Sequence, residues 1–149
     1  MHKPRRYVFV LWGDNFEEVT AAIFISELRE AGLRVKMVSL NSQQTSGAHG
    51  LALVPDLTLT QALPLARQTI CVIIPCALRV VQYFKHDPRL HEFFSLVQAN
   101  DAPIFIGSLN GSAAQDLEAL SLAVDRVYVY PLDTDLIDFS QQIAEMLLV

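Results

Sequence analysis

Ser108 lies in the stretch IFIGSLNGSAAQDL, residues 104 to 117, where an apolar run turns sharply into a small-residue helix. Many α/β enzymes present a serine nucleophile at such a corner, above the edge of the sheet. A serine hydroxyl attacks weakly unless a base removes its proton. GSLNG is displaced by one residue from the G-x-S-x-G pattern, and no acid and then histidine follow it. We therefore expect Ser108, Asn110 and Ser112 to form a turn and cap the helix.

Cys76 is a second candidate nucleophile, because it follows the apolar run ICVIIP. A thiolate there would attack better than a serine hydroxyl, although thiols are also among the most buried side chains. Cys71 lies inside the same run and is expected to be inert core. The chain has only these two cysteines, and no histidine is close enough in sequence to complete a zinc pattern. We expect free thiols, no metal and no cofactor.

Two carboxylates and a histidine complete the candidate groups. Glu17 and Glu18, in FEEVT, would suit a general acid/base pair. Carboxylates in the first turn of a helix also offset its dipole, and we favour that role. His49, in the glycine-flanked turn GAHG, is expected to be structural rather than catalytic.

The first half of the chain predicts alternating strands and helices. RYVFVLW (6–12) reads as a buried parallel strand, because it is almost continuously apolar and rich in β-formers. Apolar residues at three- and four-residue spacing predict a helix from Phe16 to Ala31, ended by Gly32. LRVKMVSL (33–40) is the next strand, and this unit has the length of a parallel crossover. Residues 41–63 predict a small hairpin or an extended excursion.

The second half continues the alternation. TICVIIP (69–75) is a central strand, and a short helical stretch through Leu78, Val81 and Phe84 follows it. Asp87 and Pro88 predict the cap and first turn of a further helix. Strands at 103–107 and 124–131 flank a helix at 112–123, and a final helix begins near residues 133–135.

These elements predict an α/β fold, a three-layer sandwich around a mostly parallel, flavodoxin-like sheet. In such sheets ligands bind beyond the carboxyl ends of the strands, where helix N-termini offer free N–H donors to anions. A carboxylate or phosphate ligand would suit this edge. The predicted ligand-binding residues there are Gly13, Cys76, Ala77, Ser108, Leu109 and Asn110.

Composition limits the class of protein. A length of 149 residues suits one domain, residues 1–149. The hydrophobic content of 52 % fits a sheet buried on both faces, an apolar subunit contact, or both, and the apolar end MLLV could pack in a dimer interface, so we expect a homo-oligomer. No apolar run approaches the roughly 20 residues that span a bilayer, and no signal peptide opens the chain, so we expect a cytoplasmic protein. A net charge of −5 argues against nucleic-acid binding.

The order of these features resembles the DJ-1/ThiJ/PfpI family of the class I glutamine amidotransferase-like superfamily. The resemblance runs through NFEEVTAA, AGLRVKMVSL, ICVIIP and IFIGSLNGSAA. It includes SGAHGLALVPDLTL, in which a glycine-flanked turn leads to an aspartate and a hydroxyl residue. It covers most of the chain and implies that family's fold.

The resemblance also implies a site. Active members carry a cysteine on a sharp elbow, touched by a glutamate from the first helix, and a glycine pair helps to bind an oxyanion. Here Ser108 takes the cysteine's position and Thr20 the glutamate's, while Cys76 and Ala77 replace the glycine pair. Glu18 cannot substitute for the glutamate at position 20, because residues two apart on a helix point in different directions.

Many members act on glyoxals, glycated groups or small carbonyl compounds, while others are chaperones or regulatory modules. We expect a catalytically degenerate member, a pseudoenzyme that binds a small anionic ligand or a protein partner. The alternative is a hydrolase or glyoxalase-like enzyme of altered chemistry, with Ser108 or Cys76 as its nucleophile. A third hypothesis is that the chain is a purely structural or assembly protein.

Overall fold

The computed structural model of the chain describes residues 6–12, 17–40, 45–47, 49–75, 87–107, 126–130 and 134–148. Within these ranges, six strands form one parallel sheet in the order β5-β2-β1-β6-β7-β8. They are β1 (Tyr7–Trp12), β2 (Val35–Ser39), β5 (Leu57–Thr58), β6 (Thr69–Ile74), β7 (Ile104–Gly107) and β8 (Val127–Tyr130). A separate antiparallel hairpin pairs β3 (Thr45–Ser46) with β4 (Ala52–Leu53).

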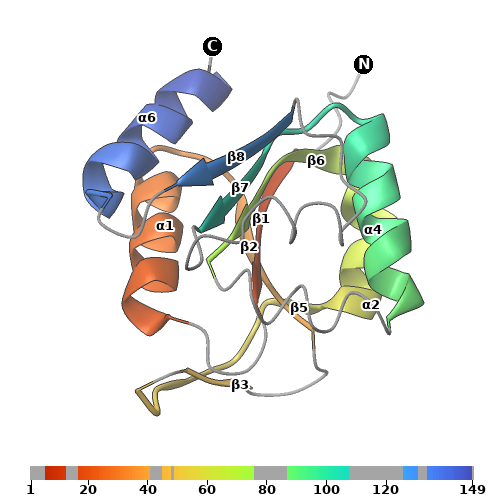
Figure 1. Cartoon of the computed structure of the whole chain (residues 1–149), viewed down its shortest axis with the longest axis horizontal. Coiled ribbons are helices and arrows are strands. Elements are labelled where there is room, and N and C mark those ends of the chain that lie inside the picture. Colours follow the sequence, from red (N-terminus) through yellow and green to blue (C-terminus); the bar gives the residue numbers. More distant parts are fainter. Residues whose placement is uncertain are drawn as a thin grey trace.

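Helices cover both faces of the sheet (Figure 1). One face carries α1 (Glu18–Glu30) and α6 (Leu136–Leu148). The other carries α2 (Leu59–Ala62), the 3₁₀ helix η1 (Leu63–Gln68) and α4 (Pro88–Ala99). The predicted three-layer α/β sandwich is confirmed.

The core explains the apolar character of the central strands. All six residues of β1 are buried, because helices pack against both of its faces. Trp12 and Phe9 from β1, Phe24 from α1 and Phe93 and Phe94 from α4 are among the largest fully buried side chains. Cys71 is buried within β6, as expected of a core thiol.

The predicted starts of two helices are confirmed by their caps. Asp87 Oδ1 accepts a hydrogen bond from the Arg89 backbone N–H at 3.0 Å, and Pro88 occupies the first turn of α4. Asp135 Oδ1 accepts from the Asp138 N–H at 3.2 Å at the start of α6.

The prediction for residues 41–63 is partly wrong. The hairpin is present, but the chain then adds β5 to the main sheet and turns into α2 and η1. A capping box starts α2: Gln61 N–H donates to Thr58 Oγ1 at 3.2 Å, and Thr58 N–H donates to Gln61 Oε1 at 2.9 Å. Burial of Leu59 and Ala62 then holds this turn against the sheet. The predicted helices through Leu78 and over 112–123 lie outside the described residues.

Candidate functional site

The strand order locates the place where an α/β sheet of this kind binds ligands. Successive strands run outward from β1 in one direction, and from β6 in the other, so the order reverses between these two strands. Ligands of such sheets bind at this switch point, beyond the carboxyl ends of the strands. Here β1 ends at Trp12, β6 at Ile74 and β7 at Gly107, on three adjacent strands. The predicted residues Gly13, Cys76, Ala77, Ser108, Leu109 and Asn110 follow these ends and lie outside the described residues.

A buried carboxylate at the start of α1 is the best-defined polar feature of this edge. Only 4 % of Glu18 is exposed. Glu18 Oε2 accepts hydrogen bonds from the backbone N–H groups of His49, at 2.9 Å, and Leu51, at 3.0 Å. The His49 ring contributes Nδ1, which lies 3.1 Å from Oε1. The carboxylate therefore holds the turn of the β3–β4 hairpin against the first helix, and we call this arrangement the Glu18 clamp.

The electrostatics of the clamp follow from these contacts. Burial by itself raises the pKa of the Glu18 carboxyl, because a charge is costly away from water. The backbone N–H groups of Leu51, Glu18 and His49, together with the His49 ring, stabilise the charged form more strongly. The pKa of Glu18 falls from 4.5 to about 2 as a result. A carboxylate so stabilised is permanently ionised near neutral pH and is a weak base.

Two glycines make the clamp possible. A Cβ at Gly47 would lie 2.3 Å from both Cγ and Cδ of Glu18, so only glycine lets the backbone approach the carboxylate. Gly50 has a φ of +84°, a backbone conformation that residues with a side chain rarely adopt. A hydrogen bond of 3.1 Å from the Gly50 N–H to the Gly47 carbonyl closes the turn between them. The expectation that His49 is structural agrees with its place in this turn.

The aspartate and hydroxyl residue of SGAHGLALVPDLTL also have structural roles. Asp56 Oδ2 accepts from the Met37 N–H at 2.8 Å and pairs with Arg29 at 2.9 Å, which joins the start of β5 to β2 and α1. Arg29 also donates to the Val35 carbonyl at 2.9 Å. The hydroxyl residue is Thr58, the N-cap of α2. Asp56 and Thr58 therefore each fix a backbone segment.

Thr20 lies one half-turn beyond the clamp on α1 and is half-buried. Glu18, two residues earlier, points to the hairpin and is bound there. Its geometry agrees with the expectation that Glu18 does not take over the position of Thr20. The position that the resemblance gives to a pocket glutamate thus has no carboxylate.

A second polar network at the carboxyl edge was not predicted from the sequence. Arg89 reaches from α4 to the Leu40 carbonyl after β2 at 3.4 Å, and to Thr60 Oγ1 of α2 at 2.9 Å. Asp87 orients it through two hydrogen bonds, of 2.7 Å and 3.0 Å. Hydrogen bonding from Arg89 lowers the pKa of the Asp87 carboxyl, and the same contact raises the pKa of Arg89. The network joins three elements that pack near the end of β2.

Gly107, the last residue of β7, is fixed by close packing. A Cβ there would lie 3.0 Å from the hydroxyl oxygen of Tyr130, whose side chain is buried on the neighbouring strand β8. A side chain at residue 107 would therefore crowd the Tyr130 hydroxyl, which is a packing reason for a glycine before Ser108. This constraint acts whether or not Ser108 is reactive.

The sheet order and the clamp define a flavodoxin-like α/β protein whose first helix is tied to a hairpin. The DJ-1/PfpI family matches residues 6–106, and the chain belongs to that family. The family predicted from the order of sequence features is thereby confirmed. The matched residues include the clamp and end just before Ser108.

Solved structures of the family have the same fold. DJ-1beta of Drosophila melanogaster is 17 % identical, with a TM-score of 0.76, over 97 % of this chain and 91 % of that one. The oxidized DJ-1 of Toxoplasma gondii is 17 % identical, with a TM-score of 0.76, over 95 % and 90 % of the two chains. A ThiJ/PfpI domain protein of Brachyspira murdochii is 14 % identical, with a TM-score of 0.73, over 99 % and 98 %. No protein of curated function matches the chain in sequence.

In the described ranges, every helix is too short or too polar to cross a bilayer.

Proposed function

We propose that the chain is a non-catalytic DJ-1/PfpI protein that acts as a small-ligand-binding, regulatory or protein-interaction module. One observation carries this proposal. Glu18, the carboxylate nearest in sequence to the position that the resemblance gives to the family glutamate, is bound to the hairpin, and the residue at that position is Thr20. A nucleophile at residue 108 would need a base, and Glu18 is both engaged and too weak a base for that task.

The ligand of this module is proposed to be a small anion bound beyond the ends of β1, β6 and β7. The reversal of strand order between β1 and β6 supports this position. The candidate residues are those that follow the strands, Gly13, Cys76, Ala77, Ser108, Leu109 and Asn110.

The purified chain is expected to show no glyoxalase, deglycase or peptidase turnover above that of a Ser108→Ala, Cys76→Ala double variant. Methylglyoxal consumption, release of free amine from a glycated substrate and peptide cleavage are the three assays. Turnover that disappears in Ser108→Ala alone would contradict the proposal and support the enzyme of altered chemistry.

Thiol labelling gives the same test a second measurement. Cys71 is fully buried, and burial strongly raises the pKa of its thiol, so a small electrophile should leave it unmodified in the folded chain. Labelling of native protein therefore reports on Cys76. Slow labelling of Cys76, like that of a free thiol, agrees with the proposal, and rapid selective labelling contradicts it.

We also propose that the chain self-associates through the hairpin beside the clamp. Three large apolar side chains are exposed there: Val19 is 66 % exposed, Leu51 54 % and Val54 71 %. Val19 follows Glu18, and Leu51 donates its N–H to that carboxylate, so these residues belong to one region of the surface. Several exposed apolar side chains in one region of the surface are typical of an interaction site.

Val54→Asp is expected to convert the oligomer to monomer, because a charge in an apolar interface loses its water without gaining a partner. Sedimentation velocity over a range of protein concentrations would measure the change. Ile137→Asp is the matched control, since Ile137 is 49 % exposed and belongs to α6 and not to the hairpin. Dissociation by Ile137→Asp and not by Val54→Asp would contradict the proposal and indicate that the interface lies on α6.

A further inference from the structure

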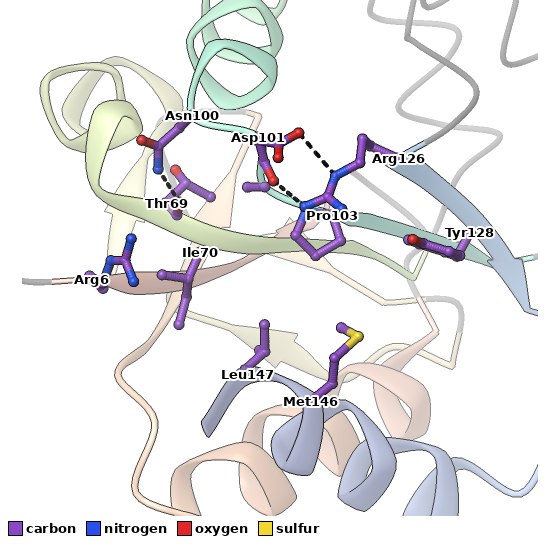
Figure 2. A pocket seen from close by; sticks show the side chains of 11 residues that line it. Arg6, Thr69, Ile70, Asn100, Asp101, Pro103, Arg126, Tyr128, Met146 and Leu147 are labelled. Atoms are coloured by element: carbon purple, nitrogen blue, oxygen red, sulfur yellow. Dashed lines mark hydrogen bonds and ion pairs between the residues drawn. The ribbon is translucent and has the colours of Figure 1, made fainter. Parts of the chain in front are cut away.

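A hollow of about 280 Å³ lies at the edge of the sheet opposite the proposed family site. Thr69 and Ile70 begin β6, Pro103 precedes β7, and Arg126 precedes β8, so the hollow is built on the amino ends of the strands. The last turn of α6 forms another wall through Met146 and Leu147 (Figure 2).

The wall after α4 is fixed by hydrogen bonds. Asn100 Nδ2 donates to the Thr69 carbonyl, and Arg126 donates to the Asp101 carbonyl. Arg126 Nε also lies 3.2 Å from Asp101 Oδ1. Asp101 has a φ of +57°, so this turn has a defined and unusual backbone shape. The Arg126 guanidinium is consequently already paired with a carboxylate.

Arg6 supplies the charge that is not compensated. Its side chain lines the hollow on the side opposite Arg126 and Tyr128 (Figure 2). Among the residues that the structure describes, no hydrogen bond or ion pair to its guanidinium is found, while Asp101 pairs with Arg126. Two guanidinium groups and one carboxylate line the hollow, so it carries one net positive charge. The carboxyl end of α6, which is nearby, carries partial negative charge and opposes the binding of multiply charged anions.

The remaining surface of the hollow is suited to an apolar group. Tyr128 is 44 % exposed and Met146 48 % exposed, although both are large and largely hydrophobic side chains. Ile70 and Leu147 are half-buried beside them. Figure 2 shows Leu147 and Met146 below Arg6, Ile70 and Tyr128, on opposite sides of one space. An apolar body placed there would remove these side chains from water.

The size of the hollow limits the ligand. Sites for drug-sized ligands and cofactors usually measure about 300 to 1,000 Å³. A volume of about 280 Å³ is just below that range, so the hollow suits a small molecule better than a nucleotide or dinucleotide. The hollow has one net positive charge, an apolar wall and a small volume, and these three properties together favour a small organic acid as its ligand.

We propose that this hollow binds a small monocarboxylate with an apolar body, its carboxylate on Arg6 and its body against Ile70, Tyr128 and Leu147. The site is separate from the one proposed at the carboxyl ends of the strands. It does not depend on whether the chain is an enzyme.

Titration of the ¹⁵N-labelled full chain with sodium benzoate, followed by two-dimensional NMR, tests the proposal. Saturable shifts are expected at the backbone amides of Ile70, Asp101 and Tyr128. Benzyl alcohol carries the same ring without the charge, and inorganic phosphate carries charge without an apolar body. Both are expected to bind more weakly than benzoate. Equal binding of either one would overturn the proposal, as would benzoate shifts confined to Ser39 and Leu40 at the other edge.

Arg6→Gln is expected to weaken benzoate binding by about three- to tenfold, the usual effect of losing one charge-assisted hydrogen bond at a partly exposed site. Arg34→Gln is the matched control, because Arg34 lines a different hollow at the same edge of the sheet. It should leave the affinity unchanged. The ¹⁵N spectra of both variants report whether they are folded. Unchanged affinity in folded Arg6→Gln, or equal losses in both variants, would overturn the proposal.

Discussion

Gly47→Ala is expected to destabilise the fold by about 2 to 3 kcal/mol, as overpacking of a tightly closed site does. The added Cβ would lie 2.3 Å from two side-chain carbons of Glu18, which is far inside van der Waals contact. Either Glu18 leaves its buried position and gives up its hydrogen bonds to His49 and Leu51, or the turn moves away from α1. Both responses open the Glu18 clamp. Urea unfolding measures the loss of stability, and amide exchange at His49 and Leu51 reports the opening.

Gly50→Ala is the matched control for Gly47→Ala, because the two glycines belong to the same turn. A Cβ at Gly50 meets no atom within 4 Å, but the φ of +84° is strained for alanine. We expect a cost of about 1 kcal/mol from this backbone strain alone, without loss of exchange protection at His49. A loss of stability in Gly47→Ala no larger than in Gly50→Ala would show that the close approach to Glu18 is not what holds the hairpin.

The sequence predicted those strands and helices that carry one strong local pattern, such as a continuous apolar run or a helix cap. Continuous apolar runs predicted β1, β6 and β7, because a strand that is buried on both faces is apolar at every position. The cap at Asp87 and the proline after it predicted the start of α4. The segment 57–68 was missed, because its strand and helices are very short and local patterns favoured turns. The capping box of Thr58 and Gln61 was the available signal for α2.

The site was less predictable, because its contacts join residues that are far apart in the sequence. Glu18 and His49 are 31 residues apart, and nothing in FEEVT indicates that the second glutamate is buried. The sequence predicted that Glu18 stabilises the helix dipole, but it did not predict the hydrogen bonds of Glu18 to the hairpin. The glycine-flanked GAHG turn was the usable signal, since glycine is required where a backbone closely approaches another group. Arg89 gave no such signal, and its contacts with Leu40 and Thr60 depend on the packing of three elements.

The family pattern in this chain divides into two groups of residues. Gly47, Gly50, Asp56 and Thr58 are present, and each one shapes or binds backbone in the structure. Thr20 and Ser108 stand at the positions where the resemblance implies chemistry. The first group therefore serves the fold, which the chain shares with DJ-1beta of Drosophila melanogaster at 17 % identity. Family membership by itself says little about activity, because the residues of this group act on the scaffold.

Acid is expected to weaken the Glu18 clamp. The pKa of Glu18 is lowered from 4.5 to about 2 in the folded chain, so the unfolded chain takes up a proton at higher pH than the folded one. The stabilisation is therefore fully present above about pH 4.5 and is lost as the pH falls toward about 2. Other carboxylates, including Asp87, also titrate in acid, so the wild type alone cannot isolate this effect.

Glu18→Gln isolates the contribution of the charge. The variant keeps a similar shape and one carbonyl acceptor, but an amide cannot accept the two backbone N–H groups and the His49 ring as a carboxylate does. The urea midpoint of the variant is expected to be clearly lower than that of the wild type at pH 7. The difference should narrow steadily between pH 4.5 and pH 2, as the wild-type carboxylate becomes protonated. Glu17→Gln, at an exposed neighbouring carboxylate, is the matched control; it should lose only the small helix-dipole contribution and should not reproduce the difference seen for Glu18→Gln. If the gap between wild type and Glu18→Gln stays constant across this range, the ionised carboxylate is not what ties α1 to the hairpin.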